Sequence, residues 1–189
     1  EGPVFESQYP DIKKQRSSRP LLFFIISSLK LIEFFPSLAR DSSSEEQVGN
    51  WTVDTSRYDN GIIELSDYGK TKGLKHTLWY EPERVYPGTE FYNKGMENPE
   101  WLISVDGEDN LMWNLADEDA LKYYSDYILA SLKENGVTIY RQDFNFAPLK
   151  YWQKADSEYY DGRTGICENH YVTNEYKYLH ECGVDYVTV

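Results

Sequence analysis

Cysteine and positive charge are both scarce in this sequence of 189 residues. The two cysteines, Cys167 and Cys182, are too few for a disulfide framework, and neither lies in a metal-binding CxxC motif. The 19 lysines and arginines face 32 aspartates and glutamates, which gives a formal net charge of −13. Because nucleic acids and anionic membranes attract basic surfaces, we expect neither as a partner. The sequence does not decide whether these two cysteines form a disulfide. It therefore leaves the redox compartment, and with it the localisation, unknown.

Long apolar runs and glycine-rich phosphate loops are missing as well. The most apolar stretch, residues 20–36, is interrupted by Lys30 and Glu33 and is too short to span a membrane. Its late start and the acidic residues before it also argue against a signal peptide. It predicts instead a buried strand or an amphipathic helix. The lack of a phosphate-binding loop gives no support to a nucleotide site, and we expect no cofactor.

Aromatic residues, by contrast, are abundant. They make up 16% of the chain, with 17 tyrosines and 5 tryptophans. Aromatic rings stack on flat apolar ligand surfaces, the faces of sugar rings among them, but they fill hydrophobic cores more often. The composition therefore suits a carbohydrate-binding surface without requiring one.

From Val48 onward the sequence alternates between helical and strand patterns. It predicts a helix over residues 62–72, a strand over 74–80, a polar loop around Pro87 and Pro99, a short strand over 101–105, a helix over 118–134 capped by Asp117, and a strand that follows Gly136 and ends by Asn145. This order predicts βα units around a parallel sheet. The chain is shorter than the roughly 250 residues of a complete eightfold barrel.

Carboxylates follow two of the predicted strands. Asp143 ends the strand after Gly136, while Glu81 and Glu83 follow the strand over 74–80. Chemistry in α/β barrels takes place at the carboxyl ends of the strands. Paired carboxylates there fit glycosidic bond cleavage, in which one attacks the sugar carbon and another transfers a proton to the leaving oxygen. The alternatives are that Asp143 caps a turn and that the two glutamates are solvated charges.

Several segments resemble the α-galactosidases of glycoside hydrolase family 36, the melibiases. They occur in register from about residue 47 to about residue 180, and several motifs in one order are more specific than any single motif. The segments are VGNWTVD (48–54), RYDNG (57–61), GLKHTLWYEPERV (73–85), NPEWL (98–102), YRQDFN (140–145) and TGICENHYV (164–172).

The resemblance implies an α/β fold, a partial TIM (β/α)8 barrel, and a retaining α-galactosidase that acts on terminal α-D-galactosides. Asp143 would be the nucleophile that forms a covalent glycosyl-enzyme. Substrate contacts would come from Trp51, Trp79, Arg141 and Asn145, and Arg141 stands where most relatives carry a lysine. We expect no metal ligands.

The same comparison assigns Glu81 and Glu83 to structural rather than catalytic roles. It also exposes departures from the family pattern. A strand ending in a DxGW motif is not found in residues 1–46, and neither a CxSGG segment nor the acid/base aspartate that follows it is found before Val189. We therefore expect a divergent or misread segment at 1–46, a partial catalytic domain at 47–189, and weak or no activity of this chain alone.

Two other functions stay open. A non-catalytic carbohydrate-binding module on a barrel scaffold would use Trp51 and Trp79 for stacking. A metal site made of Glu168, His170 and His180 is the weakest hypothesis, because residues two apart do not share a helix face. The linkage and length of the substrate and the oligomeric state are left unknown.

Overall fold

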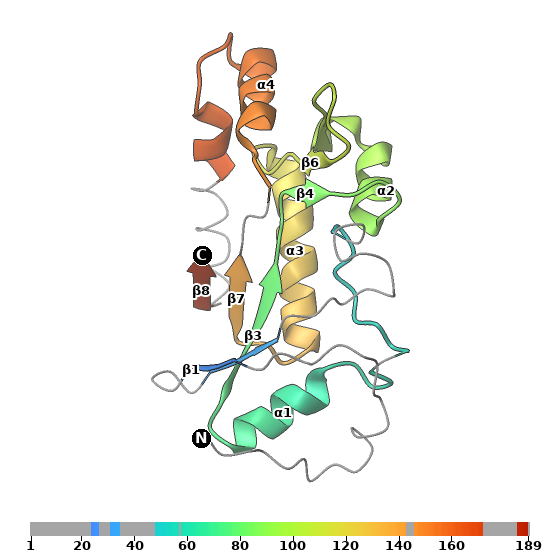
Figure 1. Ribbon diagram of the computed structural model, residues 1–189, viewed down its shortest axis with the longest axis vertical. Coiled ribbons are helices and arrows are strands. Elements are labelled where there is room, and N and C mark those ends of the chain that lie inside the picture. Colours follow the sequence, from blue (N-terminus) through green and yellow to red (C-terminus); the bar gives the residue numbers. More distant parts are fainter. Residues whose placement is uncertain are drawn as a thin grey trace.

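A computed structural model of the chain describes residues 24–26, 31–34, 48–56, 58–142, 146–171 and 185–188 (Figure 1). Five strands form one sheet in the order β1-β2-β3-β7-β8. The strands are β1 (Phe24–Ile26), β2 (Leu31–Phe34), β3 (Lys75–Tyr80), β7 (Ile139–Gln142) and β8 (Asp185–Thr188). All neighbours are parallel except β1 and β2. The apolar stretch at 20–36 thus contributes strands rather than a helix, and the predicted parallel pairing of β3 with β7 is confirmed.

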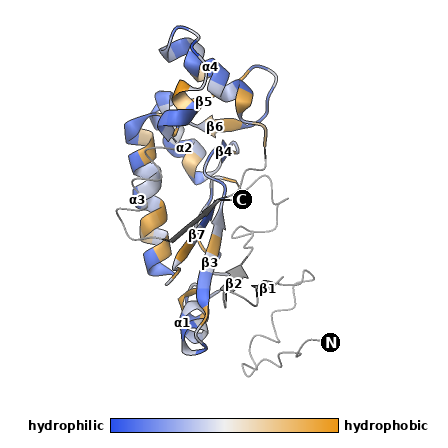
Figure 2. Ribbon diagram, turned by 90° about the vertical axis from the view of Figure 1, so that its left-hand side faces the viewer, coloured by the Kyte–Doolittle hydropathy of each residue, from blue (hydrophilic) through white to orange (hydrophobic). Residues whose placement is uncertain are grey.

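The described strands make an open sheet, so they support the α/β class without forming a closed barrel. Helix α3 (Glu118–Glu134) covers one face of β3 and β7, as Figure 2 shows. Its buried residues include Tyr124, Ile128 and Leu132. No helix within the described ranges is both long and apolar enough to cross a membrane.

Both ends of α3 follow the sequence prediction. At the start, Asp117 Oδ1 accepts hydrogen bonds from the backbone N–H groups of Asp119 (3.0 Å) and Ala120 (2.9 Å), which are among the unpaired donors of the first turn. At the end, Gly136 adopts a φ of +63°, where a side chain would be strained. The chain then turns directly into β7.

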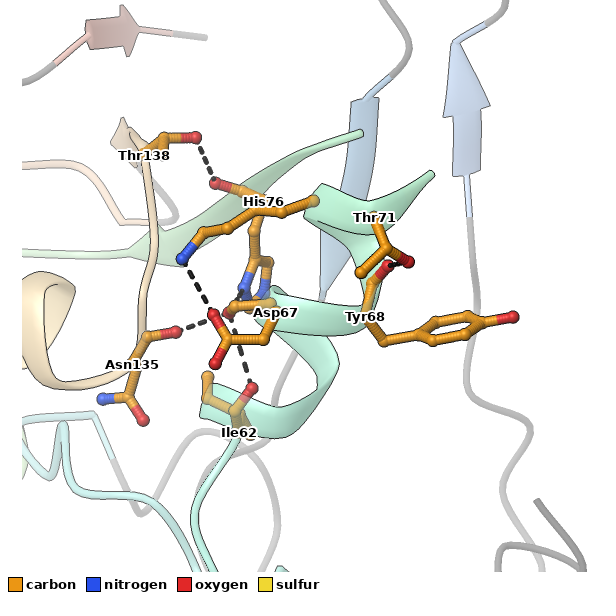
Figure 3. A network of polar contacts seen from close by, with 9 residues as sticks. Ile62, Asp67, Tyr68, Thr71, His76, Asn135 and Thr138 are labelled. Carbon is orange, nitrogen blue, oxygen red and sulfur yellow. Dashed lines mark hydrogen bonds and ion pairs between the residues drawn. The ribbon is translucent and has the colours of Figure 1, made fainter. Parts of the chain in front are cut away.

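The amino end of β3 is joined to helix α1 (Ile63–Thr71) by a buried polar network (Figure 3). The Ser66 hydroxyl contacts His76 Nδ1 and donates to the backbone carbonyl of Asn135. The Thr138 backbone N–H donates to the carbonyl of His76 at 3.1 Å. These contacts connect α1, β3 and the segment that leads into β7.

A second, antiparallel sheet lies between β3 and α3 in the chain. It consists of β4 (Arg84–Val85), β6 (Leu111–Trp113) and β5 (Leu102–Ile103), in that order. The predicted strand over 101–105 therefore does not belong to the parallel sheet, which corrects the βα assignment there. Its partner β6 is a short strand that local sequence patterns do not reveal, since three apolar residues show no periodicity.

The predicted polar loop around Pro87 and Pro99 contains helix α2 (Glu90–Glu97), followed by the short 3-10 helix Pro99–Trp101. Thr89 caps α2, because its hydroxyl accepts a hydrogen bond from the Tyr92 backbone N–H at 3.3 Å. Only Phe91 and Gly95 are buried in this helix. Two turns with one large buried side chain are too short a pattern for a sequence-based prediction.

Both α4 (Leu149–Tyr159) and the antiparallel sheet stand beyond the carboxyl ends of β3 and β7 (Figure 1). Two side chains connect them: the Tyr151 hydroxyl donates to the carbonyl of Asn110 at 2.9 Å, and the Lys150 ammonium pairs with Glu108. The segments that follow β3 and β7 are therefore attached to each other above the ends of these strands.

Candidate functional site

Three of the residues predicted to contact substrate come together near the carboxyl ends of β3 and β7. Trp79 and Arg141 are cross-strand partners in the parallel register, and both are partly buried. Trp51 packs edge-on against Trp79, with ring centroids 6.4 Å apart, and against Tyr80 at 5.6 Å. Trp51 itself is 6% exposed, so it supports Trp79 from below the surface.

The position of Trp51 depends on the start of α2. The backbone N–H groups of Glu90 and Phe91 donate to Asn50 Oδ1 (2.8 Å) and to the carbonyl of Gly49 (3.1 Å). Gly49 has a φ of +108°, and a Cβ there would lie 2.5 Å from Thr89 Oγ1. Only glycine fits such a close approach, so the segment before Trp51 is tied to α2.

Glu81 is fully buried and forms an ion pair with Arg84, whose side chain is 11% exposed. Arg84 Nε lies 2.8 Å from Glu81 Oε1, and Nη2 donates to Oε2 at 3.0 Å. The Nη2 contact is a charge-assisted hydrogen bond, which is stronger than a hydrogen bond between neutral groups. The structural role predicted for Glu81 fits this pairing, and its alternative as a solvated charge is wrong.

Glu83 is also fully buried and belongs to a second network at the end of β7. Its Oε1 accepts hydrogen bonds from the Tyr171 hydroxyl (2.9 Å) and the Gln142 side-chain amide (3.4 Å). Tyr140 Oη donates to Gln142 Oε1 at 3.2 Å. The sequence prediction missed Gln142. Its place directly before Asp143, at the end of a predicted strand, was the available signal.

Tyr171 reaches this network because Asp156 holds the loop before it. The buried carboxylate of Asp156 accepts hydrogen bonds from the backbone N–H groups of Gly165 (2.6 Å) and Cys167 (2.9 Å). Residues 166–171 are helical, and the ring of Tyr171 stacks on Trp152 of α4 at 5.9 Å. A buried anion bound to backbone N–H groups thus sets the start of this helix.

Of the two histidines that the structure describes, His76 lies away from the carboxyl end of β3 and His170 lies at the surface. Burial, together with the positive charge of Lys70, lowers the pKa of His76 to about 4, so His76 is neutral at pH 7. His76 lies near the amino end of β3, opposite the candidate site. His170 is exposed, and its Nδ1 is 3.3 Å from the Tyr160 hydroxyl. Glu168 is exposed, and His180 lies outside the described residues.

No group of three histidine, cysteine, aspartate or glutamate side chains that could hold a metal ion occurs in the part of the chain that the structure describes. Asp143 and Asn145 lie outside that part. Their roles as nucleophile and substrate contact stay predictions.

Comparisons with known proteins agree on one family. The melibiase family model matches residues 34–176. Among curated proteins, the α-galactosidase AgaA of Geobacillus stearothermophilus is 30% identical over 104 residues, and the α-galactosidase of Escherichia coli is 26% identical over 104 residues. Each match covers 52% of this chain and 14% of the relative, so the matched part of this chain spans about a seventh of their length.

Solved structures give the same picture for the fold. The crystal structure of AgaA from Geobacillus stearothermophilus superposes with a TM-score of 0.59 at 20% identity, over 84% of this chain and 23% of that chain. The α-galactosidase from Lactobacillus brevis superposes with a TM-score of 0.59 at 16% identity, over 84% of this chain and 22% of that chain.

Proposed function

Because the chain belongs to the melibiase family, we propose that the protein hydrolyses terminal α-D-galactosides with retention of configuration. The curated relatives are α-galactosidases. Solved variants of AgaA are complexes with stachyose and raffinose, and a Thermus thermophilus α-galactosidase was solved with p-nitrophenyl α-D-galactopyranoside. These ligands are α-galactosides, and they support the same substrate class here.

The proposed scaffold is a partial (β/α)8 barrel in which β2, β3, β7 and β8 are neighbouring parallel strands. The parallel register of these strands supports this scaffold. Helix α3 supports it too, because it follows β3 and precedes β7 along the chain. In such a barrel the active site lies at the carboxyl ends of the strands, where the candidate site lies. The division into a divergent segment at 1–46 and a catalytic domain at 47–189 stays a prediction.

In the proposed reaction, the carboxylate of Asp143 attacks the anomeric carbon of the galactoside. The bond to the leaving oxygen breaks as a carboxylic acid protonates that oxygen, and a covalent galactosyl-enzyme forms. Water, deprotonated by the same second carboxyl group, then attacks the anomeric carbon and releases galactose and Asp143. No residue of this chain is assigned as the acid/base.

The observation that carries the proposal is the register of Trp79 with Arg141, two residues before Asp143 in the sequence. Trp79, supported by Trp51, presents an aromatic ring to the apolar face of the sugar. The Arg141 guanidinium donates hydrogen bonds to sugar hydroxyls, with a planar geometry that differs from that of a lysine. Asn145 completes the proposed substrate contacts.

Mass spectrometry of the intact protein after incubation with an activated fluorinated α-galactosyl inhibitor tests this function. The good leaving group of the inhibitor needs little help from an acid, so labelling depends mainly on the nucleophile. We expect a mass gain that maps to Asp143 and is absent from Asp143→Ala. A folded sample that gains no mass would contradict the proposal, and galactoside binding by that sample would favour a non-catalytic binding module.

A further inference from the structure

Three buried polar side chains from distant parts of the chain meet at the end of β7. Glu83 follows β3, Gln142 is the last residue of β7, and Tyr171 ends the helical residues 166–171. Their exposed fractions are 0%, 1% and 1%. Burial of polar groups is unfavourable unless they are hydrogen-bonded, so this contact is a specific feature of the fold.

The donor and the acceptor of each hydrogen bond in this group follow from its partners. The Tyr140 hydroxyl donates to the carbonyl oxygen of Gln142, so the Gln142 amide nitrogen faces the other way. That nitrogen contacts the Tyr171 hydroxyl and lies 3.4 Å from Glu83 Oε1. Because Tyr171 donates its own proton to Glu83, the Gln142 amide is the donor to Tyr171.

We propose that Gln142 is a positioning residue, held by Glu83 and Tyr171, that fixes the end of β7 and thereby sets the nucleophile Asp143. This inference rests on the proposed function, since Asp143 receives its role there. The backbone of Gln142 is already in register with Tyr80 and Thr188 on the two neighbouring strands. The side-chain contacts add a restraint from outside the sheet at the residue that is bonded to Asp143.

Position 142 requires an amide for this role. A carboxamide accepts one hydrogen bond through its oxygen and donates two through its nitrogen, which matches Tyr140 on one side and Glu83 with Tyr171 on the other. Methionine fills a similar volume but neither accepts strongly nor donates. Glutamate accepts from Tyr140 but places a second carboxyl group beside Glu83, and two like charges in a buried site repel each other.

The test measures two properties of the full-length protein and of four variants: Gln142→Met, Gln142→Glu, Tyr171→Phe and Tyr124→Phe. The first property is hydrogen–deuterium exchange of a peptide that contains residues 139–145. The second is kcat and KM on an α-galactoside. Tyr124→Phe is the matched control, because Tyr124 is as buried as Tyr171 and its hydroxyl lies 3.1 Å from the Tyr140 hydroxyl.

We expect faster exchange of this peptide in Gln142→Met, Gln142→Glu and Tyr171→Phe than in Tyr124→Phe. We expect kcat to fall about 10- to 100-fold in the same three variants, with KM changed less than about threefold, because misplacement of a reacting group affects the transition state more than ground-state binding. Adding Glu83→Gln to Gln142→Glu restores one amide and one carboxylate, and should recover kcat to within about tenfold of the parent protein.

The two proposals fail in different ways. Unchanged exchange in Gln142→Met and Tyr171→Phe, relative to Tyr124→Phe, would overturn the positioning role whatever the activity. A loss of kcat equal in Tyr124→Phe and Tyr171→Phe would also overturn it, because it would show a general effect on packing. A parent protein without turnover or labelling would overturn the proposed function, while the exchange measurement still decides whether this group holds the end of β7.

Discussion

Arg84 and Glu81 form a two-point ion pair inside the protein, with Nε–Oε1 and Nη2–Oε2 distances of 2.8 and 3.0 Å. The two residues are separated by a proline and a glutamate in the turn after β3. The pair joins the end of β3 to β4, the first strand of the antiparallel sheet. Because the pair is buried, each charge stabilises the other in place of the water that it has lost.

Removal of one partner of this pair should destabilise the protein strongly. Arg84→Met leaves the Glu81 carboxylate buried without its guanidinium, and we expect the free energy of unfolding to fall by about 3–5 kcal/mol. The double variant Glu81→Leu with Arg84→Met removes both charges and should be more stable than Arg84→Met alone. Urea unfolding measures both, and a double variant less stable than the single one would contradict this account.

His76 should make the protein less stable in mild acid. Its pKa is about 4 in the folded state and about 6.5 in the unfolded state, so the unfolded state binds more protons between these values. The stability is fully present above pH 6.5 and is lost as the pH falls toward 4, by up to roughly 3 kcal/mol.

Urea unfolding at pH 7.5 and pH 5 measures this effect in the parent protein and in His76→Gln. The variant should show a smaller drop in stability between the two pH values than the parent. His170→Gln is the matched control, because it makes the same substitution at an exposed histidine. An equal drop in the parent and in His76→Gln would contradict the assignment.

Gly95→Ala should destabilise the protein, although alanine usually favours a helix over glycine. A Cβ on Gly95 would lie 2.4 Å from Leu102 Cγ, so α2 could not approach β5 as closely. Overpacking of this kind costs about 1–3 kcal/mol, more than the helix propensity gained. Thermal unfolding should show the loss, and Leu102→Ala in the same protein should make the added methyl group less harmful.

Arg141→Ala should raise KM on an α-galactoside more than it lowers kcat, if the guanidinium binds sugar hydroxyls equally in the substrate and transition-state complexes. Arg141→Lys keeps the charge and should raise KM less. Steady-state kinetics on the full-length protein measures both. An unchanged KM in Arg141→Ala would exclude Arg141 from substrate binding.

Local patterns predicted the elements that carry their own signals. Helix α3 has a capping aspartate, a periodic apolar face and a terminal glycine, and all three act within a few residues of the helix. The strands β3 and β7 were predicted from their β-branched and aromatic residues, and the motif order from 48 to 172 indicated the family. Helix α2 and the antiparallel sheet carry no such signals because they are short and depend on packing.

The sequence by itself determined the family, the parallel α/β arrangement and the residues to test at the strand ends. Only the tertiary structure decided that Glu81 and Glu83 are buried, and that Gln142 lies between Glu83 and Tyr171. The physical reason is distance along the chain. Glu83 and Tyr171 are 88 residues apart, and no local periodicity records which side chain will neutralise or orient another across such a separation. Burial and partner choice are properties of the folded chain as a whole.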